Sequence, residues 1–270
     1  MRIFAIKNDE DKKTLAYLLY YEKEKSFYIE LPDDADPWET PLILSSFAKK
    51  NITTVNSYWS RMWVEQRIIP SDRQNIGQVL KENNLSEYDE FDLLMLSNGR
   101  CAQDELYLEE MIEGDMPEEI VKRFEKKIED IVPLQNFSLL AFFRNGTIKK
   151  CDIREFFSKN KALETFLSLN KKMFSLVQVQ LGGYGICWEE NMSISDSELY
   201  ENGIEIPLSS DDFREFVVHR VINATEAAEL LDCSRQNIND LIKRNKLHPI
   251  KTSEKNTLIL KSEILKRKWQ

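Results

Sequence analysis

The amino-acid sequence predicts an α+β protein of three small domains, two that combine an antiparallel sheet with helices and a mostly helical third. Its 270 residues are 42% hydrophobic and 10% aromatic, which is enough for packed cores. Short apolar runs joined by turn residues alternate with amphipathic helical patterns. Composition and charge change along the chain, and we place the domains at residues 1–114, 115–208 and 209–270.

The first domain opens with two predicted strands, residues 15–21 and 26–31, because aromatic and aliphatic side chains fill both runs around a charged turn. Two helices are expected later. The first spans residues 71–84, with Ser71 or Asp72 as its N-cap. The second begins after Ser86 and stops at Gly99.

The second domain is predicted to begin with a helix over residues 117–130, because Ile120, Phe124 and Ile128 follow one another at steps of four. A β-hairpin follows, with Asn145 and Gly146 as the two positive-φ residues of a type I′ turn. Further along we expect a helix at residues 162–169. Two short strands follow it, residues 176–181 and 185–188, with a glycine turn at residues 182–183 between them.

The third domain contains two predicted short helices, residues 226–231 capped by Thr225 and residues 235–244 capped by Ser234. Ala228 is small enough to let the helices cross closely, and Ile238 is placed to pack between them. Asp232 occupies the turn, where positive φ is needed and Asp is better tolerated than most residues. This spacing indicates a helix-turn-helix.

Two predicted strands follow, residues 249–251 and 257–260, and then a basic helix from Ser262. A β-wing beside the second helix would complete a winged helix-turn-helix. The alternative is an ordinary helical hairpin with a solvated polar face. The candidate DNA-binding residues are donor-rich or cationic: Ser234, Arg235, Gln236, Asn237, Asn239, Lys243, Arg244, Lys251, Lys255 and Lys261.

Charge separates the C-terminus from the rest of the chain. Residues 219–270 contain 11 basic and 6 acidic residues, a net of +5. The remaining residues contain 26 basic and 40 acidic residues, a net of −14. A basic end on an acidic body is typical of a segment that faces nucleic acid.

Residues 225–264 resemble the small winged helix-turn-helix of excisionases and MerR-type regulators, with an early Ala-Ala pair, a turn, a polar second helix and a wing. Asp232 and Cys233 depart from that pattern, where Gly and Val are more usual. The resemblance implies binding to double-stranded DNA.

The middle segment, with GGYGICW and SELYENG, resembles a bacterial family of domains of unknown function. That family occurs alone, fused to helix-turn-helix units, or encoded beside small toxins as a candidate antitoxin. The resemblance implies partner binding, and the glycines, Trp188 and Tyr200 are expected to define the fold.

The first segment resembles the N-terminal subdomain of HipA-type toxin kinases over residues 41–45, 68–73 and 89–102. Asn98, Gly99 and Arg100 replace the usual Gly-Gly-Asp, and no kinase core follows, so no activity is carried over. In related three-component systems this subdomain stands apart and inhibits its kinase. An unrelated small α+β domain is the alternative.

Several classes of function are disfavoured. No apolar run approaches the roughly 18 residues of a membrane span, and no signal-peptide core is present. The four cysteines form no CxxC pair, which favours reduced thiols in a cytoplasmic protein without a metal or cofactor. An enzyme is a third alternative, and the carboxylates considered for its site are Asp152, Glu189 and Glu190.

We therefore expect a sequence-specific DNA-binding transcriptional regulator of an antitoxin-like or autoregulatory type. The alternative is an antitoxin-like protein whose main role is to bind a toxin or kinase. A homodimer on paired half-sites is an option that the sequence leaves open.

Overall fold

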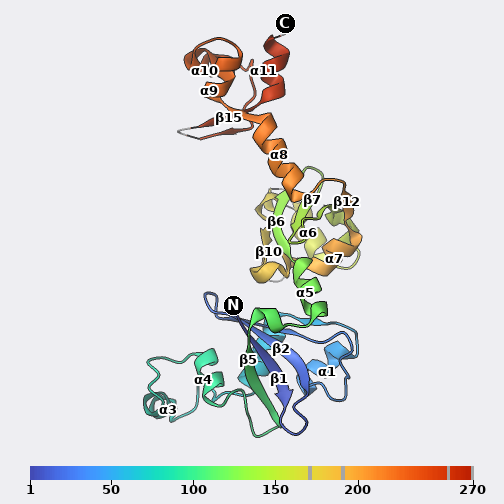
Figure 1. The fold of residues 1–270 in the computed structure, drawn as a ribbon, viewed down its shortest axis with the longest axis vertical. Coiled ribbons are helices and arrows are strands. Elements are labelled where there is room, and N and C mark those ends of the chain that lie inside the picture. Colours follow the sequence, from blue (N-terminus) through green and yellow to red (C-terminus); the bar gives the residue numbers. More distant parts are fainter. Residues whose placement is uncertain (170–171, 190–191, 254–255, 269–270) are drawn as a thin grey trace. The chain divides into compact units, whose positions relative to one another are not determined.

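The computed structural model describes residues 1–169, 172–189, 192–253 and 256–268, and its contacts divide the chain into two compact units, Met1–Phe124 and Glu125–Gln270 (Figure 1). The fold is mixed α+β with several antiparallel sheets, as the sequence predicted. The three-domain division stays a prediction. Distinct hydrophobic clusters lie in the first unit, in the sheets that follow, and near the C-terminus.

The first unit is built on a five-stranded antiparallel sheet with the order β4-β3-β2-β1-β5. The predicted hairpin is present as β2 and β3. Strand β1 was missed, although its apolar residues are buried and it pairs with both β2 and β5. The strands are β1 Arg2–Asn8, β2 Thr14–Tyr21, β3 Ser26–Glu30, β4 Thr54–Val55 and β5 Leu106–Met111.

Helices α1 Leu42–Ala48, α2 Ser57–Glu65, α3 Ile76–Glu82 and α4 Glu90–Leu96 belong to the same unit. The first two were not predicted. The cap assignments at Ser71 or Asp72 and at Ser86 were wrong. Helix α3 begins only after Asn75, with no side-chain cap. Helix α4 is capped by Asp89, whose carboxylate accepts hydrogen bonds from two backbone N–H groups of the first turn at 3.0 and 3.1 Å.

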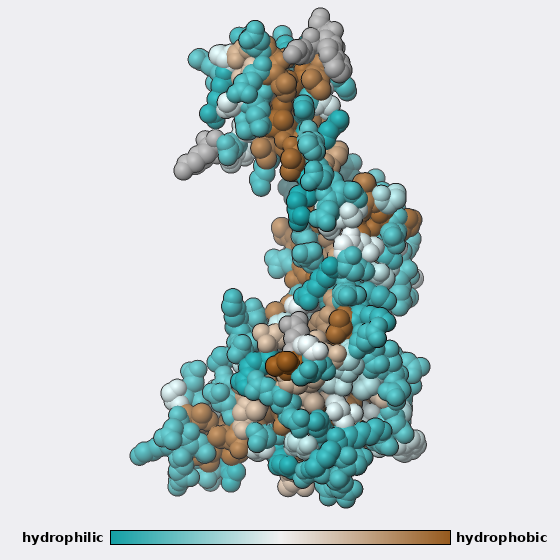
Figure 2. Space-filling view, in the orientation of Figure 1, coloured by the Kyte–Doolittle hydropathy of each residue, from teal (hydrophilic) through white to brown (hydrophobic). Residues whose placement is uncertain are grey.

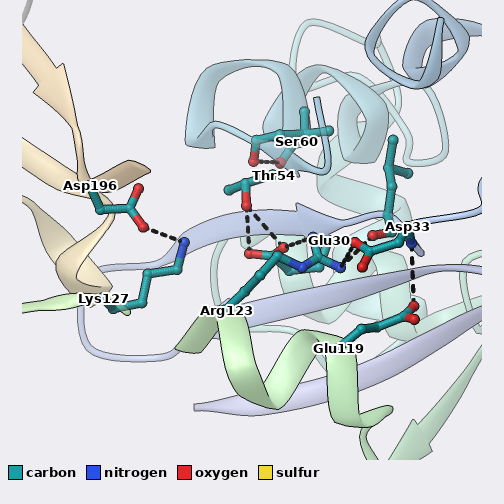
Figure 3. A network of polar contacts seen from close by, with 10 residues as sticks. Glu30, Asp33, Thr54, Ser60, Glu119, Arg123, Lys127 and Asp196 are labelled. Carbon is teal, nitrogen blue, oxygen red and sulfur yellow. Dashed lines mark hydrogen bonds and ion pairs between the residues drawn. The ribbon is translucent and has the colours of Figure 1, made fainter. Parts of the chain in front are cut away.

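Helix α5, Glu118–Glu125, is shorter than predicted, and its Arg123 contacts the end of strand β3 and the residue that follows it (Figure 3). The guanidinium donates to the fully buried Glu30 carboxylate at 2.7 Å and to the Leu31 carbonyl at 2.6 Å. The Thr54 hydroxyl donates to both Glu30 oxygens. A buried carboxylate needs such partners, because leaving water is costly for a charge.

The second unit starts with a four-stranded antiparallel sheet of order β12-β8-β7-β6 and a three-stranded sheet of order β11-β10-β9. The predicted helix at 162–169 is present, whereas Ile128 lies on β6 and not on a helix. The elements are β6 Ile128–Pro133, β7 Ser138–Phe143, β8 Ile148–Asp152, α6 Lys161–Leu169, β9 Gln178–Val179, β10 Gly185–Glu189, β11 Met192–Ser195, α7 Asp196–Asn202 and β12 Ile204–Ile206.

The β7–β8 hairpin is present, but the prediction that it has a type I′ turn was wrong. Gly146 has a φ of 81°, whereas Asn145 is not among the residues with positive φ. The Phe143 carbonyl accepts from Gly146, and the Phe143 N–H donates to Thr147, which leaves a three-residue loop. The loop is therefore a β-turn followed by a glycine bulge. The Asn145 side chain accepts a hydrogen bond from the Thr147 N–H, and Asn145 itself does not adopt the left-handed backbone conformation.

Two buried polar groups lie side by side in this part of the second unit (Figure 3). Lys127 donates to the Asp196 carboxylate at 3.0 Å, and its ammonium lies 4.0 Å from the centroid of the Tyr184 ring. Burial raises the pKa of Asp196, against the opposing effect of Lys127. The pair joins the residue before β6 to the first turn of α7.

The C-terminal part consists of α8 Ser210–Arg220, β13 Val221–Asn223, α9 Ala224–Leu230, α10 Arg235–Lys243, β14 Lys251–Thr252, β15 Thr257–Leu260 and α11 Lys261–Lys268. Helix α8 was missed, although Ser209 and Asp212 form a capping box at its start. Short 3₁₀ helices elsewhere cover Glu113–Asp115, Ile153–Phe156, Met173–Leu176 and Leu181–Gly183.

The surface drawn in Figure 2 is mostly hydrophilic, with separate hydrophobic areas. Within the described residues, no helix combines the length and the apolar character that crossing a membrane requires.

Candidate nucleic-acid interface

Helix α9 begins earlier than predicted, because its cap is Asn223 and not Thr225. The Asn223 side-chain oxygen accepts from the N–H groups of Thr225 and Glu226 at 2.8 and 3.0 Å. The Glu226 carboxylate accepts from the Asn223 N–H at 2.8 Å in return. This reciprocal capping box sets where β13 ends and the helix starts.

Asp232 makes the turn between α9 and α10 with a φ of 51°, as predicted from its position. The Cys233 N–H donates to the Ala228 carbonyl at 3.0 Å, and the Asp232 N–H donates to the Glu229 carbonyl at 3.2 Å. These two bonds form a Schellman motif, which ends a helix on one left-handed residue. The turn geometry is therefore obtained without glycine.

Ala227 and Ile238 are fully buried between the two helices, and Ala228 is nearly so. The small alanines allow α9 and α10 to approach closely, and Leu241 and Ile242 pack against the same cluster. Leu247, Ile259 and Ile264 extend this cluster to the loop, strand β15 and helix α11. The apolar side of α10 is thus buried, and its polar side is left for solvent.

Helix α10 starts at Arg235 as predicted, and the Ser234 hydroxyl accepts from the Asn237 N–H at 3.2 Å. The seven candidate residues on this helix and its caps are exposed: Ser234, Arg235, Gln236, Asn237, Asn239, Lys243 and Arg244. Guanidinium and amide side chains form bidentate hydrogen bonds with base edges, and hydroxyl and cationic groups bind phosphates. The four base-reading candidates lie in the N-terminal half of the helix.

The predicted strand pair is present, but it belongs to a three-stranded sheet of order β13-β15-β14. Strand β15 matches the predicted bounds, whereas β14 starts at Lys251 and not at Pro249. Lys251 is exposed and Lys261 is half-buried at the start of α11, and Lys255 lies outside the described residues. Strand β13 was missed because three residues carry too little periodicity.

Two of the carboxylates named for an enzyme, Asp152 and Glu189, lie on strands of different sheets. Asp152 accepts hydrogen bonds from its neighbour Arg154, which lower its pKa. Glu189 is exposed on β10, and Glu190 lies outside the described residues. The part of the chain that the structure describes holds no cluster of His, Cys, Asp and Glu suited to a metal ion.

Gly183 fits a structural role, as expected for the middle segment. Its φ is 79°, and a Cβ there would lie 2.3 Å from the Ile128 carbonyl oxygen. Trp188 is buried, and its indole N–H donates to the Phe174 carbonyl at 3.1 Å. Tyr200 packs edge-on against Phe143 with ring centroids 4.9 Å apart.

Comparison with protein families gives a match in this middle segment. Residues 128–205 match the family described as protein of unknown function, DUF2442, which confirms the predicted resemblance. No curated protein and no solved structure matches the chain. The resemblances of the first and last segments stay predictions.

Proposed function

We propose that this chain is a sequence-specific DNA-binding transcriptional regulator whose residues 209–270 form a winged helix-turn-helix. The observation that supports the proposal most directly is helix α10. Its apolar side is buried against α9, and its exposed side carries a run of base-reading donors followed by cations.

In the proposed complex, the N-terminal half of α10 enters the major groove. Arg235 would pair with guanine, and Gln236, Asn237 or Asn239 with adenine. Lys243 and Arg244 at the end of the helix would contact phosphates, together with Lys251, Lys255 and Lys261 from the wing and α11.

A gel shift with the promoter region of its own gene tests this proposal. Arg235→Ala combined with Asn239→Ala should weaken binding at least about 30-fold, because two base contacts of about 1 kcal/mol or more each are lost. The matched control removes the same side-chain types from the middle segment, as Arg154→Ala with Asn202→Ala. Equal binding by both double variants, or binding insensitive to salt, would contradict the proposal.

A second proposed role is antitoxin-like binding of a protein partner such as a toxin or kinase. The first unit supports it, because Trp38 and Leu42 are 87% and 91% exposed, and exposed large apolar side chains are typical of protein-binding surfaces. A toxin or kinase gene next to this gene, and co-purification of its product with this chain, are the expected results. A product that never co-purifies would count against this role.

A further inference from the structure

Helix α8, Ser210–Arg220, is exposed along most of its length (Figure 1). None of its residues is buried, and Phe216, Val217 and Val218 are 51%, 50% and 62% exposed. An isolated helix of this length is marginal in water, and most helices are stabilised by packing an apolar side against a neighbour. Adjacent exposed apolar side chains are typical of protein interfaces. Part of the α8 surface therefore has no packing partner among the described residues.

The first turn of α8 is attached to the β7–β8 hairpin. The Ser210 N–H donates to the Gly146 carbonyl at 3.3 Å, and the Phe213 ring packs edge-on against Phe142 with centroids 5.5 Å apart. The helix also contacts β13, which follows it, and α11. These contacts fix the start of the helix, whereas Phe216, one turn later, stays half exposed.

Periodicity selects one face of α8. Phe213, Phe216, Val217 and Arg220 follow the i, i+3, i+4, i+7 pattern and therefore share one side of the helix. Phe216 lies at the centre of this face. Asp212 precedes it by four residues and Arg220 follows it by four, so both charges are its neighbours on the helix surface.

The charges of Asp212 and Arg220 do not neutralise each other within one chain. They are separated by eight residues, which is about 12 Å of helix rise. Asp212 Oδ2 accepts from the Ser209 N–H and hydroxyl at 2.8 and 2.7 Å, whereas Oδ1 accepts no hydrogen bond from a described residue. Arg220 forms no ion pair with a described residue, and its central carbon lies 6.0 Å from the Phe216 ring centroid. Both groups are available to another molecule.

Two further ion pairs run along the helix and are solvent-exposed. Arg214 donates to Asp211 at 2.8 Å, and His219 lies 3.2 Å from Glu215. Pairs of this kind contribute little to stability and take up no apolar surface. They leave the face centred on Phe216 as the part of α8 that can bind a partner.

The order of charges along α8 makes this face complementary to itself. The first turn carries Asp211 and Asp212, and the last turn carries His219 and Arg220. A second copy of the helix in the opposite direction therefore places acidic residues beside basic ones, and the two helix dipoles are also antiparallel. A parallel copy would place Asp212 beside Asp212. The charge pattern thus favours a second copy of this chain as the partner, in the antiparallel orientation.

We infer that α8 pairs with α8 of a second copy of this chain, antiparallel about a two-fold axis at Phe216. The two Phe216 rings contact each other, and Asp212 of each copy pairs with Arg220 of the other. A two-fold interface repeats every contact, so the charge pair occurs twice.

The expected interface is small. A helix of 11 residues is about 16 Å long, and two such helices bury less than the roughly 800 Å² per partner of a standard interface. We therefore expect a weak dimer whose population depends on concentration. The pairing brings two copies of α10 into one assembly, as binding to paired half-sites requires, but it does not rest on DNA binding.

Sedimentation velocity of the full chain over a series of concentrations tests the inference. The unchanged chain should shift from monomer towards dimer as its concentration rises. Phe216→Ala should lower the association constant about tenfold or more, because a ring is lost from both sides of the interface. Alanine is a better helix former than phenylalanine, so this change does not weaken α8 itself.

A charge exchange tests the antiparallel register. Arg220→Glu places like charges opposite each other in both pairs and should lower the association constant about tenfold. Asp212→Lys should do the same, and circular dichroism checks that α8 remains helical without this part of its cap. The two changes combined in one chain should restore dimerisation, because each lysine then faces a glutamate of the other copy.

Arg214→Glu is the matched control. Arg214 is also exposed, and it is turned by about 160° from Phe216 around the helix axis, so this change should leave the association constant unaltered.

Three results would overturn the inference: a chain that stays monomeric at every concentration, a Phe216→Ala variant that dimerises like the unchanged chain, or a double charge variant that dimerises no better than the single ones. A purely monomeric chain would assign the face to a different protein. Arg235→Ala with Asn239→Ala should dimerise normally, so failure of DNA binding and failure of this dimer are separately visible.

Discussion

Asp232 and Asn245 show how single residues shape the C-terminal segment. Both have φ near 50° and end α9 and α10. After each, the next N–H donates back to a helix carbonyl, Cys233 to Ala228 and Lys246 to Leu241. Asp and Asn tolerate the left-handed region better than other side chains, but glycine enters it at lower cost.

Asp232→Gly should therefore stabilise the α9–α10 pair by about 0.5–1 kcal/mol, because the strain of a left-handed Cβ is removed. Asp232→Val should destabilise it by about 1–2 kcal/mol, since a β-branched residue is strained there. Hydrogen exchange of the α10 amides measures both effects. Faster exchange in the glycine variant would contradict the assigned turn.

Cys151 is a second residue whose behaviour follows from its surroundings. Burial raises the pKa of its thiol to about 12, and the thiol lies 3.5 Å from the Leu199 carbonyl. Because the thiolate is the nucleophile, only about one thiol in 10⁴ would be ionised at pH 8.

We expect iodoacetamide at pH 8 to leave Cys151 unmodified in the folded chain while Cys233, which is half-buried, is modified. Mass spectrometry of peptides after timed labelling measures the rates. The same labelling in denaturant should modify both cysteines equally, and fast native labelling of Cys151 would show that the β8–α7 packing is open.

At the scale of elements, helix α5 contacts the rest of the first unit through a buried apolar side chain and a buried charge pair. Ile120 is fully buried on the same helix, and Arg123 supplies the cation that Glu30 needs (Figure 3). A buried pair contributes little net stability when intact, but removing one partner leaves an uncompensated charge.

Arg123→Ala should accordingly destabilise the first unit by about 3–5 kcal/mol. Arg154→Ala is the control, because its ion pair with Asp152 is solvent-exposed and should contribute at most about 1 kcal/mol. Urea unfolding followed by hydrogen exchange in β3 compares the two variants. Equal midpoints would mean that Glu30 finds another partner or is uncharged.

For the whole molecule, the unequal charge distribution governs how the proposed DNA contacts respond to salt. The acidic remainder of the chain limits non-specific attraction to DNA, whereas the basic C-terminal residues supply phosphate contacts.

Lys243→Ala should weaken binding to all DNA sequences similarly and reduce the slope of log K against log salt by about one unit. Lys159→Ala, an exposed lysine of the middle segment, should leave the slope unchanged. Filter binding over a series of salt concentrations gives both slopes. A slope that Lys243→Ala does not alter would remove this lysine from the interface.

Elements with strong local signals were predicted well. Strands β2 and β15, helices α6 and α10, and the Ser234 cap follow from periodicity and capping chemistry close in sequence. Strand β13 was missed because its three residues carry too little periodicity, and strand β1 was missed although it pairs with the adjacent β2 and the distant β5. A cavity of about 600 Å³ in the first unit could not be predicted, because its lining comes from several segments between Asn8 and Leu106.

Sequence alone was sufficient for the α+β class, the charge separation and the polar face of α10, because each depends on composition or on neighbours within a few residues. Tertiary packing decided that Glu30 is neutralised by Arg123, that β1 pairs with β5, and that Arg67 donates to Asp104. Those outcomes depend on contacts across long sequence separations, which local patterns do not encode.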